Sequence, residues 1–369
     1  MVVGEIRKLN SLRGLAALAV VVAHFSGETG WLGGYPGTGA GQLGVMLFFI
    51  LSGFLMAFLY VDQPVDRRRY WRYAVARFAR VVPLFAAVII ASAVLPRLGV
   101  TGLLYDLPTR PEVLSHVLLL SGKNILWTIP TELHFYVAFL AIWWIAGRSP
   151  GAAALTSAGV IALSIGFGTP RFTGEVLSIP YDLRLAQVIP FFLAGVLFAF
   201  IYRRWTFPGR QQRSVFAVAL LAIPLMYPLI FEAVFGFRHG LWNDPLVLAV
   251  VTAVFGVVLF TVPDTSVVTS NRVGDFFGRI SYSLYLLHVP VMRFIIDLEL
   301  PNTARFVIFL AISVALSTAV FYAFERPAQR ILRRRLLGEA RQRRPYAMPA
   351  HRVPDIDLTT VEKSHTRRR

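Results

Sequence analysis

The stretch LNSLRGLAALAVVVAHF at residues 9–25 combines a long apolar run with two ionisable side chains, Arg13 and His24. Residues 14–23 are all Gly, Ala, Leu or Val. A helix rises about 1.5 Å per residue, so an apolar run that continues to residue 27 crosses most of a hydrocarbon core of about 30 Å. The stretch therefore predicts a membrane-spanning helix that carries polar groups within the bilayer.

Similar apolar runs follow along most of the chain. Hydrophobic residues make up 56% of the sequence and charged residues 15%, whereas a soluble domain carries roughly 25% charge. We therefore predict an all-α, polytopic membrane protein of about ten transmembrane helices. The predicted spans cover residues 10–27, 42–60, 80–97, 128–147, 150–168, 185–202, 214–235, 245–263, 280–298 and 303–324.

The net charge of +17 is distributed in a way that predicts membrane orientation. Lys and Arg gather at 7–8, 67–80, 203–213, 272–279 and after 326, while the loop 27–41 has none. Such a bias in alternate loops marks the cytoplasmic side, so we expect no nucleic-acid partner. The pattern predicts a multi-pass protein of the inner (plasma) membrane with both termini in the cytoplasm.

Two regions follow from this distribution. Residues 1–326 form the predicted transmembrane domain, and residues 327–369 form a basic cytoplasmic tail held near anionic headgroups by its charge. The first span lacks a small-residue cleavage site, so we expect it to be retained. The chain has no cysteine, which excludes disulfides and thiolate nucleophiles, and we expect no metal site.

Arg13 and His24 lie eleven residues apart. At about 100° per residue, this spacing places them on one helix face, about 16 Å apart along the axis. A histidine deep in a span is a candidate proton-transfer group. The alternative is an orientation anchor at Arg13 and a packing residue at His24.

Further polar residues occur at comparable depths in other spans. Glu132 opens the fourth span and is a candidate partner for an imidazole, or simply a residue favoured at a helix start. Arg77 and Arg80, at i and i+3, suit phosphate binding, with positive-inside anchoring as the alternative. In the ninth span Ser281, Tyr285 and His288 are spaced to line one side.

Seven segments, in this order, resemble the acyltransferase 3 family of membrane O-acyltransferases. They are LNSLRGLAALAVVVAHF, GVMLFFILSGFL, RFARVVP, WTIPTELHFY, RLAQVIPFFLAGVL, ISYSLYLLHVPV and FERP. The resemblance covers about 320 residues. One departure is Met46, where many members carry an acidic residue.

The resemblance implies roles for individual residues. It implies a catalytic His24 positioned by Arg13, with Glu132 as the carboxylate that orients His24 or the acceptor. Arg77 and Arg80 match the arginine pair attributed to coenzyme A. We also expect Ser281 and Tyr285 to donate hydrogen bonds to the donor or the developing oxyanion.

The resemblance also implies the substrates. The donor is an acyl-CoA, most often acetyl-CoA, used as a substrate with no bound cofactor. The acceptor is a hydroxyl of a carbohydrate, a cell-surface or exported glycan, or a glycolipid. An intracellular small molecule such as a macrolide is the alternative acceptor, and a transporter or a receptor is the alternative class of protein. The oligomeric state stays open.

Overall fold

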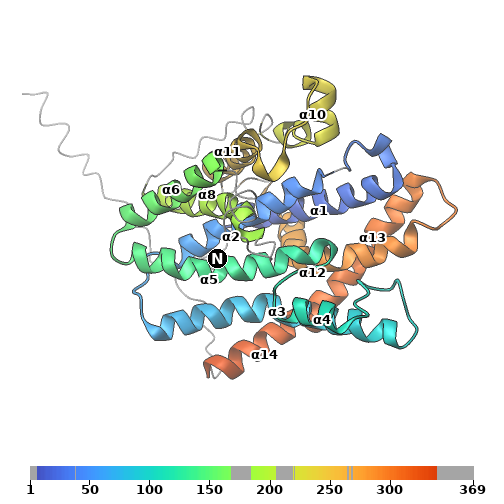
Figure 1. Cartoon of the computed structure of the whole chain (residues 1–369), viewed down its shortest axis with the longest axis horizontal. Coiled ribbons are helices and arrows are strands. Elements are labelled where there is room, and N and C mark those ends of the chain that lie inside the picture. Colours follow the sequence, from blue (N-terminus) through green and yellow to red (C-terminus); the bar gives the residue numbers. More distant parts are fainter. Residues whose placement is uncertain are drawn as a thin grey trace, which may run out of the picture. The chain divides into compact units, whose positions relative to one another are not determined.

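The computed structural model describes residues 6–37, 39–167, 184–204, 219, 221–263, 266 and 269–338. In this part of the chain, helices are the only regular elements. The α-helices are α1 (Arg7–Thr29), α2 (Gly41–Tyr60), α3 (Arg67–Arg97), α4 (Arg110–Val117), α5 (Thr128–Ala146), α6 (Pro150–Phe167), α8 (Arg184–Arg204), α10 (Pro228–Phe235), α11 (Pro245–Thr261), α12 (Arg272–Ile295), α13 (Asn302–Val320) and α14 (Arg326–Leu337). Short η segments are η1 (Trp31–Gly34), η2 (Asn124–Trp127), η4 (Leu241–Asn243) and η5 (Phe321–Glu325). Figure 1 shows their arrangement.

The prediction of an all-α polytopic membrane protein is confirmed. Six helical segments are long and apolar enough to cross a bilayer, and two shorter apolar helices, Pro150–Gly166 and Pro245–Thr261, accompany them. The predicted span over 214–235 lies partly outside the described residues. Its described part is not one continuous helix, because α10 begins at Pro228, whose missing N–H favours a helix start.

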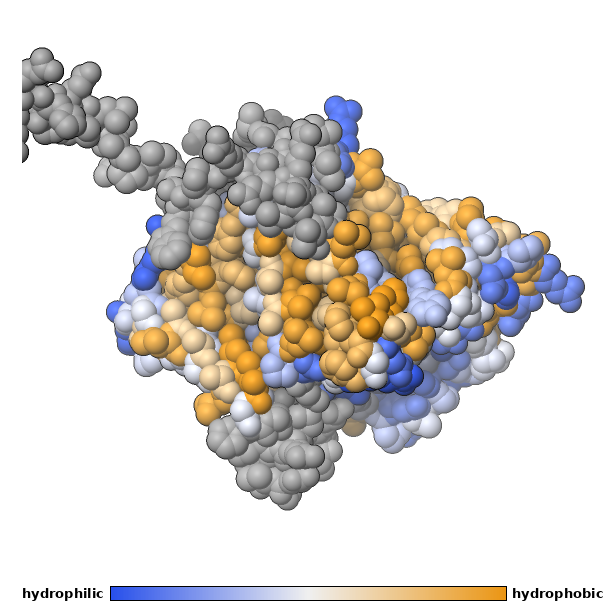
Figure 2. Space-filling model, turned by 90° about the horizontal axis from the view of Figure 1, so that it is seen from above, coloured by the Kyte–Doolittle hydropathy of each residue, from blue (hydrophilic) through white to orange (hydrophobic). Residues whose placement is uncertain are grey.

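Large apolar side chains are exposed on several of the spanning helices. Leu155 is 75% exposed, Val137 69% and Val307 60%. Figure 2 shows apolar residues spread over much of the face seen there. A surface of this kind would aggregate in water, whereas a bilayer covers it with lipid chains.

Helix α1 packs against α2 on one side and α12 on the other. Glycines make both approaches close. A Cβ added to Gly44 would lie 2.6 Å from the Ala16 carbonyl oxygen, and one added to Gly14 would lie 2.7 Å from Cβ of Phe277. Small residues are what allow helix backbones to approach this closely within a membrane.

The first turns of α1 are also fixed by polar contacts. Buried Lys8 donates from Nζ to the carbonyl oxygens of Leu259 (2.7 Å) and Val262 (2.8 Å), at the C-terminal end of α11. A cation at this end is favoured by the unpaired carbonyls and the helix dipole. Arg7 pairs with Asp275 on α12 at 2.6 Å. These contacts fix the position of α1 along its own axis as well as its distance from its neighbours.

An apolar cluster fills the space between α1, α12 and α13. Phe25 and Phe309 are fully buried and stack with ring centroids 5.3 Å apart. Val21, Leu284 and Ile295 complete the packing around them. The cluster lies close in sequence to His24 and holds that half of α1 in place.

The end of the described chain runs from α13 through the π-helix η5 into α14. Helix α14 packs along α3, as Figure 1 shows. Nε1 of Trp71 donates to the Leu336 carbonyl at 3.2 Å, and Arg333 donates to the Ala76 carbonyl. The first part of the predicted tail is therefore helical, and the tail from residue 339 onward lies outside the described residues.

A close helix contact between α2 and α8 generates a stability prediction. A Cβ on Gly53 would overlap the Phe192 carbonyl oxygen, and one on Gly195 would overlap the Ile50 carbonyl oxygen. We expect Gly53→Ala to push the two helices apart and to cost roughly 1–3 kcal/mol of stability, as overpacking does. Thermal unfolding in detergent measures the loss.

The matched control is Gly159→Ala on α6, where an added Cβ meets nothing within 4 Å. We expect this variant to unfold at or above the wild-type temperature, because Ala favours a helix over Gly. Equal unfolding temperatures for the two variants would contradict the close α2–α8 contact.

Candidate active site

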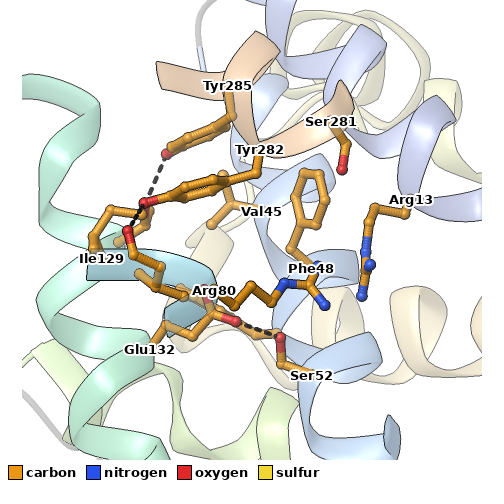
Figure 3. A pocket seen from close by; sticks show the side chains of 13 residues that line it. Arg13, Val45, Phe48, Ser52, Arg80, Ile129, Glu132, Ser281, Tyr282 and Tyr285 are labelled. Carbon is orange, nitrogen blue, oxygen red and sulfur yellow. Dashed lines mark hydrogen bonds between the residues drawn. The ribbon is translucent and has the colours of Figure 1, made fainter. Parts of the chain in front are cut away.

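A cavity lies where α1, α2, α3, α5 and α12 meet. Its lining combines charged and hydroxyl side chains with apolar ones, as Figure 3 shows. The lining residues are Arg13, Val45, Phe48, Phe49, Ser52, Arg80, Val81, Thr128, Ile129, Glu132, Ser281, Tyr282 and Tyr285. One cavity is thus surrounded by five of the seven predicted site residues, which are Arg13, Arg80, Glu132, Ser281 and Tyr285.

Two guanidinium groups dominate the charge of the cavity. Arg13 from α1 and Arg80 from α3 point toward each other beside Phe48 (Figure 3). The carboxylate among the lining residues is Glu132. Two cations with one anion leave the lining positively charged, which favours an anionic or strongly polar ligand.

Arg77 has different surroundings from Arg80, although the two are neighbours on one helix face. Its guanidinium carbon lies 5.4 Å from the ring centre of Tyr60 and 6.0 Å from those of Tyr73 and Tyr136. Nη2 also donates to the Tyr60 hydroxyl at 3.3 Å. The aromatic rings surround this cation within the protein, and Arg77 does not line the cavity.

Glu132 is the centre of a small hydrogen-bond network. Its Oε1 accepts from the Tyr136 hydroxyl at 2.5 Å and from Ser52 Oγ at 2.8 Å. The network links α5 to α2 and fixes the carboxylate at the cavity wall. The described hydrogen bonds of Glu132 thus do not include one to His24.

The hydroxyls of Tyr285 and Ser281 are both engaged with backbone carbonyls. The Tyr285 hydroxyl donates to the Ile125 carbonyl at 3.1 Å, and Ser281 Oγ donates to the Gly278 carbonyl at 3.0 Å. Thr128 Oγ1 lies 3.2 Å from the Tyr285 hydroxyl. Either hydroxyl must leave its carbonyl before it can donate to a substrate.

His24 lies outside the cavity lining and is paired with a second histidine. Nδ1 of His24 lies 3.0 Å from Nε2 of His288, and the two ring centres are 5.0 Å apart. The ring of Tyr285, which lines the cavity, lies 6.1 Å from the His288 ring. Tyr285 therefore lines the cavity and also lies near the histidine pair.

The comparisons with known proteins identify the family. The acyltransferase domain model matches residues 6–323, which include every residue of the cavity and both histidines. The chain belongs to this acyltransferase family. It is thus related to enzymes that transfer acyl groups, rather than to transporters or receptors.

Two relatives illustrate the similarity. The chain is 26% identical to the acyltransferase MdmB of Streptomyces mycarofaciens over 78% of this chain and 79% of that protein. It is 22% identical to the peptidoglycan O-acetyltransferase OatA of Listeria monocytogenes over 87% of this chain and 55% of that protein. The chain thus spans about half the length of OatA. No solved structure matches the chain.

One buried carboxylate that the sequence pattern did not assign to the site interacts with the arginines of the cavity. Glu325 is buried at the end of the π-helix, where it accepts from Ser283 Oγ at 2.5 Å and from Gln329 at 3.1 Å, and it interacts electrostatically with Arg80 and Arg13. A π-helical turn is frequent at functional sites because it redirects one side chain. The sequence signal was a carboxylate in FERP, directly after an apolar run.

The different surroundings of Arg77 and Arg80 generate a second prediction. We expect Arg77→Gln to lose roughly 1–2 kcal/mol of stability, because the buried cation–π contacts with three tyrosines disappear. We expect Arg80→Gln to unfold close to the wild-type temperature, because its side chain borders a cavity. Thermal unfolding of both variants, in the same detergent, tests the contrast. Equal losses would mean that the two arginines have the same structural role.

Proposed function

We propose that this protein is a membrane O-acyltransferase that moves an acyl group, acetyl in the first instance, from acyl-CoA to a hydroxyl of a cell-surface or exported glycan or glycolipid. The observation that carries the proposal is the arrangement along α1. Helix α1 carries both Arg13, which lines the cavity, and the half-buried His24, which pairs with the buried His288. The chain belongs to the acyltransferase family.

The donor fits the arginine-rich side of the molecule. The phosphates of coenzyme A are anions that guanidinium groups bind with paired hydrogen bonds. Arg80 and Arg13 supply such groups at the cavity, and the arginines at the start of α3 lie further out along the same helix. We place this side in the cytoplasm, with the protein in the plasma membrane and both termini inside, by the positive-inside rule.

His24 acts as the general base in this proposal. Its ring nitrogen takes the proton of the acceptor hydroxyl while the oxygen attacks the thioester carbonyl carbon. The carbon–sulfur bond then breaks, and the thiolate leaves with that proton as free coenzyme A. The products are one ester and one thiol for each thioester and hydroxyl consumed.

The remaining cavity residues stabilise or position the reactants. Tyr285 lines the cavity and its ring lies 6.1 Å from that of His288, so its hydroxyl is within the region where we place the thioester. We propose that this hydroxyl and Ser281 exchange their carbonyl partners for the donor, where they stabilise the developing oxyanion. Glu132, held by Ser52 and Tyr136, presents a fixed carboxylate to the acceptor side of the reaction.

Support for a glycan acceptor comes from one relative, whose name describes a peptidoglycan O-acetyltransferase. The match to MdmB covers a larger share of that protein, 79% against 55%, and its name leaves the acceptor open. A small intracellular acceptor, such as a macrolide, is therefore the alternative that the acceptor experiment must address.

The donor half-reaction is the first test. Full-length protein in nanodiscs is incubated with radiolabelled acetyl-CoA and host extracts, and free coenzyme A and labelled products are followed. We expect His24→Ala to lower the rate by about 10²–10⁴-fold, the usual contribution of a general base, and we expect Arg13→Ala and Arg80→Gln to raise KM for acetyl-CoA.

His134→Ala is the matched control, because His134 is a partly buried histidine of α5 that does not line the cavity. We expect it to retain wild-type rates. Full activity in a folded His24→Ala protein would remove the base from the mechanism. If no extract elicits coenzyme A release from the wild type, the acyl-CoA reaction itself is wrong for this chain.

The acceptor is identified by where the label goes. We expect radioactive acetyl groups in the glycan or glycolipid fraction, released by mild alkali as expected for O-acetyl esters. Label confined to a soluble small molecule would replace the glycan proposal with the intracellular alternative. Unlabelled extract from cells that lack this protein serves as the acceptor source, so that target hydroxyls are unmodified at the start.

A further inference from the structure

His288 occupies a fully buried position on α12, and each of its ring nitrogens has a defined partner. Nδ1 lies 3.1 Å from the Leu284 carbonyl oxygen, and Nε2 lies 3.0 Å from Nδ1 of His24. A carbonyl oxygen can only accept a hydrogen bond. The Nδ1 atom of His288 therefore carries the hydrogen in this contact.

The protonation of Nε2 in His288 follows from burial. A neutral imidazole carries one hydrogen, so Nε2 then holds a free lone pair. The charged form would bury an imidazolium whose described hydrogen-bond partners are backbone groups of Leu284 and Tyr285 and another imidazole, with no carboxylate. An ion buried without a countercharge is strongly unfavourable. His288 is thus neutral, and its Nε2 accepts.

We propose that His288 is a positioning residue that fixes His24 in the tautomer with hydrogen on Nδ1, so that Nε2 of His24 is the basic nitrogen. The hydrogen bond between the two rings requires one donor, and His288 Nε2 cannot be it. Nδ1 of His24 therefore donates. This inference rests on the proposed role of His24 as the general base, and it names the atom that takes the proton.

A histidine suits this position better than a carboxylate. Enzymes often orient a catalytic imidazole with a buried Asp or Glu, but an ionised side chain within a span costs on the order of 2.5–3.5 kcal/mol on insertion scales. His288 supplies the acceptor without charge, and the Leu284 carbonyl fixes its own tautomer in turn. Leu284 and Met292, one helical turn before and after His288, belong to the buried apolar cluster.

The pair also fits the proton cycle of the reaction. When Nε2 of His24 takes the acceptor proton, both of its nitrogens carry hydrogen, and the Nδ1–H bond to His288 becomes charge-assisted and therefore stronger. His288 itself keeps the same hydrogen throughout. The proton then leaves from Nε2 of His24 to the thiolate of coenzyme A, so that no proton remains on the pair after turnover.

Two variants of His288 separate positioning from packing. In His288→Gln the side-chain oxygen can accept from His24 Nδ1, whereas in His288→Phe a ring of similar size accepts nothing. We expect the Phe variant to lose about 10–100-fold in kcat, as supporting hydrogen-bond partners do, with KM for acetyl-CoA unchanged. We expect the Gln variant to recover most of that loss. His134→Gln controls for the loss of a histidine from a span.

Solid-state ¹⁵N NMR of histidine-labelled, full-length protein in liposomes reports the tautomers directly and needs no substrate. The His24 signals are assigned by their loss in His24→Gln. We expect hydrogen on Nδ1 and none on Nε2 for both His24 and His288 in the wild type, and a mixture of His24 tautomers in His288→Phe.

Three outcomes would overturn the proposal. They are hydrogen on Nε2 of His24 in the wild type, an unchanged tautomer in folded His288→Phe, or a folded His288→Gln protein as inactive as His288→Phe. Failure of the wild type to consume any acyl-CoA would contradict the proposed function alone, because the NMR measurement still decides the tautomer. The two inferences therefore fail separately.

Discussion

Direct contact between helix backbones at glycine is the constraint on which the site depends. Gly44 and Gly14 allow α1 to lie against α2 and α12 with no side chain between them. Arg13 and His24 both belong to α1, while their partners come from neighbouring helices. A hydrogen bond weakens steeply beyond about 3.2 Å. A displacement of α1 by the width of one methyl group would therefore separate His24 from His288.

The polar groups within the spans fall into two sets with different surroundings. Arg77 is enclosed by tyrosine rings, and Lys8 caps a helix end. The partners of these two cations belong to the protein itself, so we expect both to strengthen the fold. Arg13 and Arg80 instead border a cavity, next to a carboxylate held by two hydroxyls. Burying either set of charged groups within the bilayer costs free energy. A substrate in the cavity can pair with the second set, Arg13 and Arg80.

Much of the fold could be predicted from apolar run length, because a bilayer requires helices of a fixed minimum length. Helical periodicity also placed Arg13 and His24 on one face. The sequence could not distinguish Arg77 from Arg80, since the tyrosines that enclose Arg77 come from α2, α3 and α5. Nor could it pair His24 with His288, which lies 264 residues away. The break before Pro228 follows from a proline, which hydropathy does not weigh, and the π-helix at Phe321–Glu325 also has no signal in hydropathy.

The glycine contacts also have a mechanical consequence. Where two backbones touch, no side chain can change its rotamer to make room, so we expect α1 and α12 to resist displacement relative to each other. Helices α3 and α14 meet instead through long side chains, such as Trp71 and Arg333, on an exposed surface. The two imidazoles belong to α1 and α12, so we expect the glycine contacts to preserve their 3.0 Å approach even where helices that meet through side chains move.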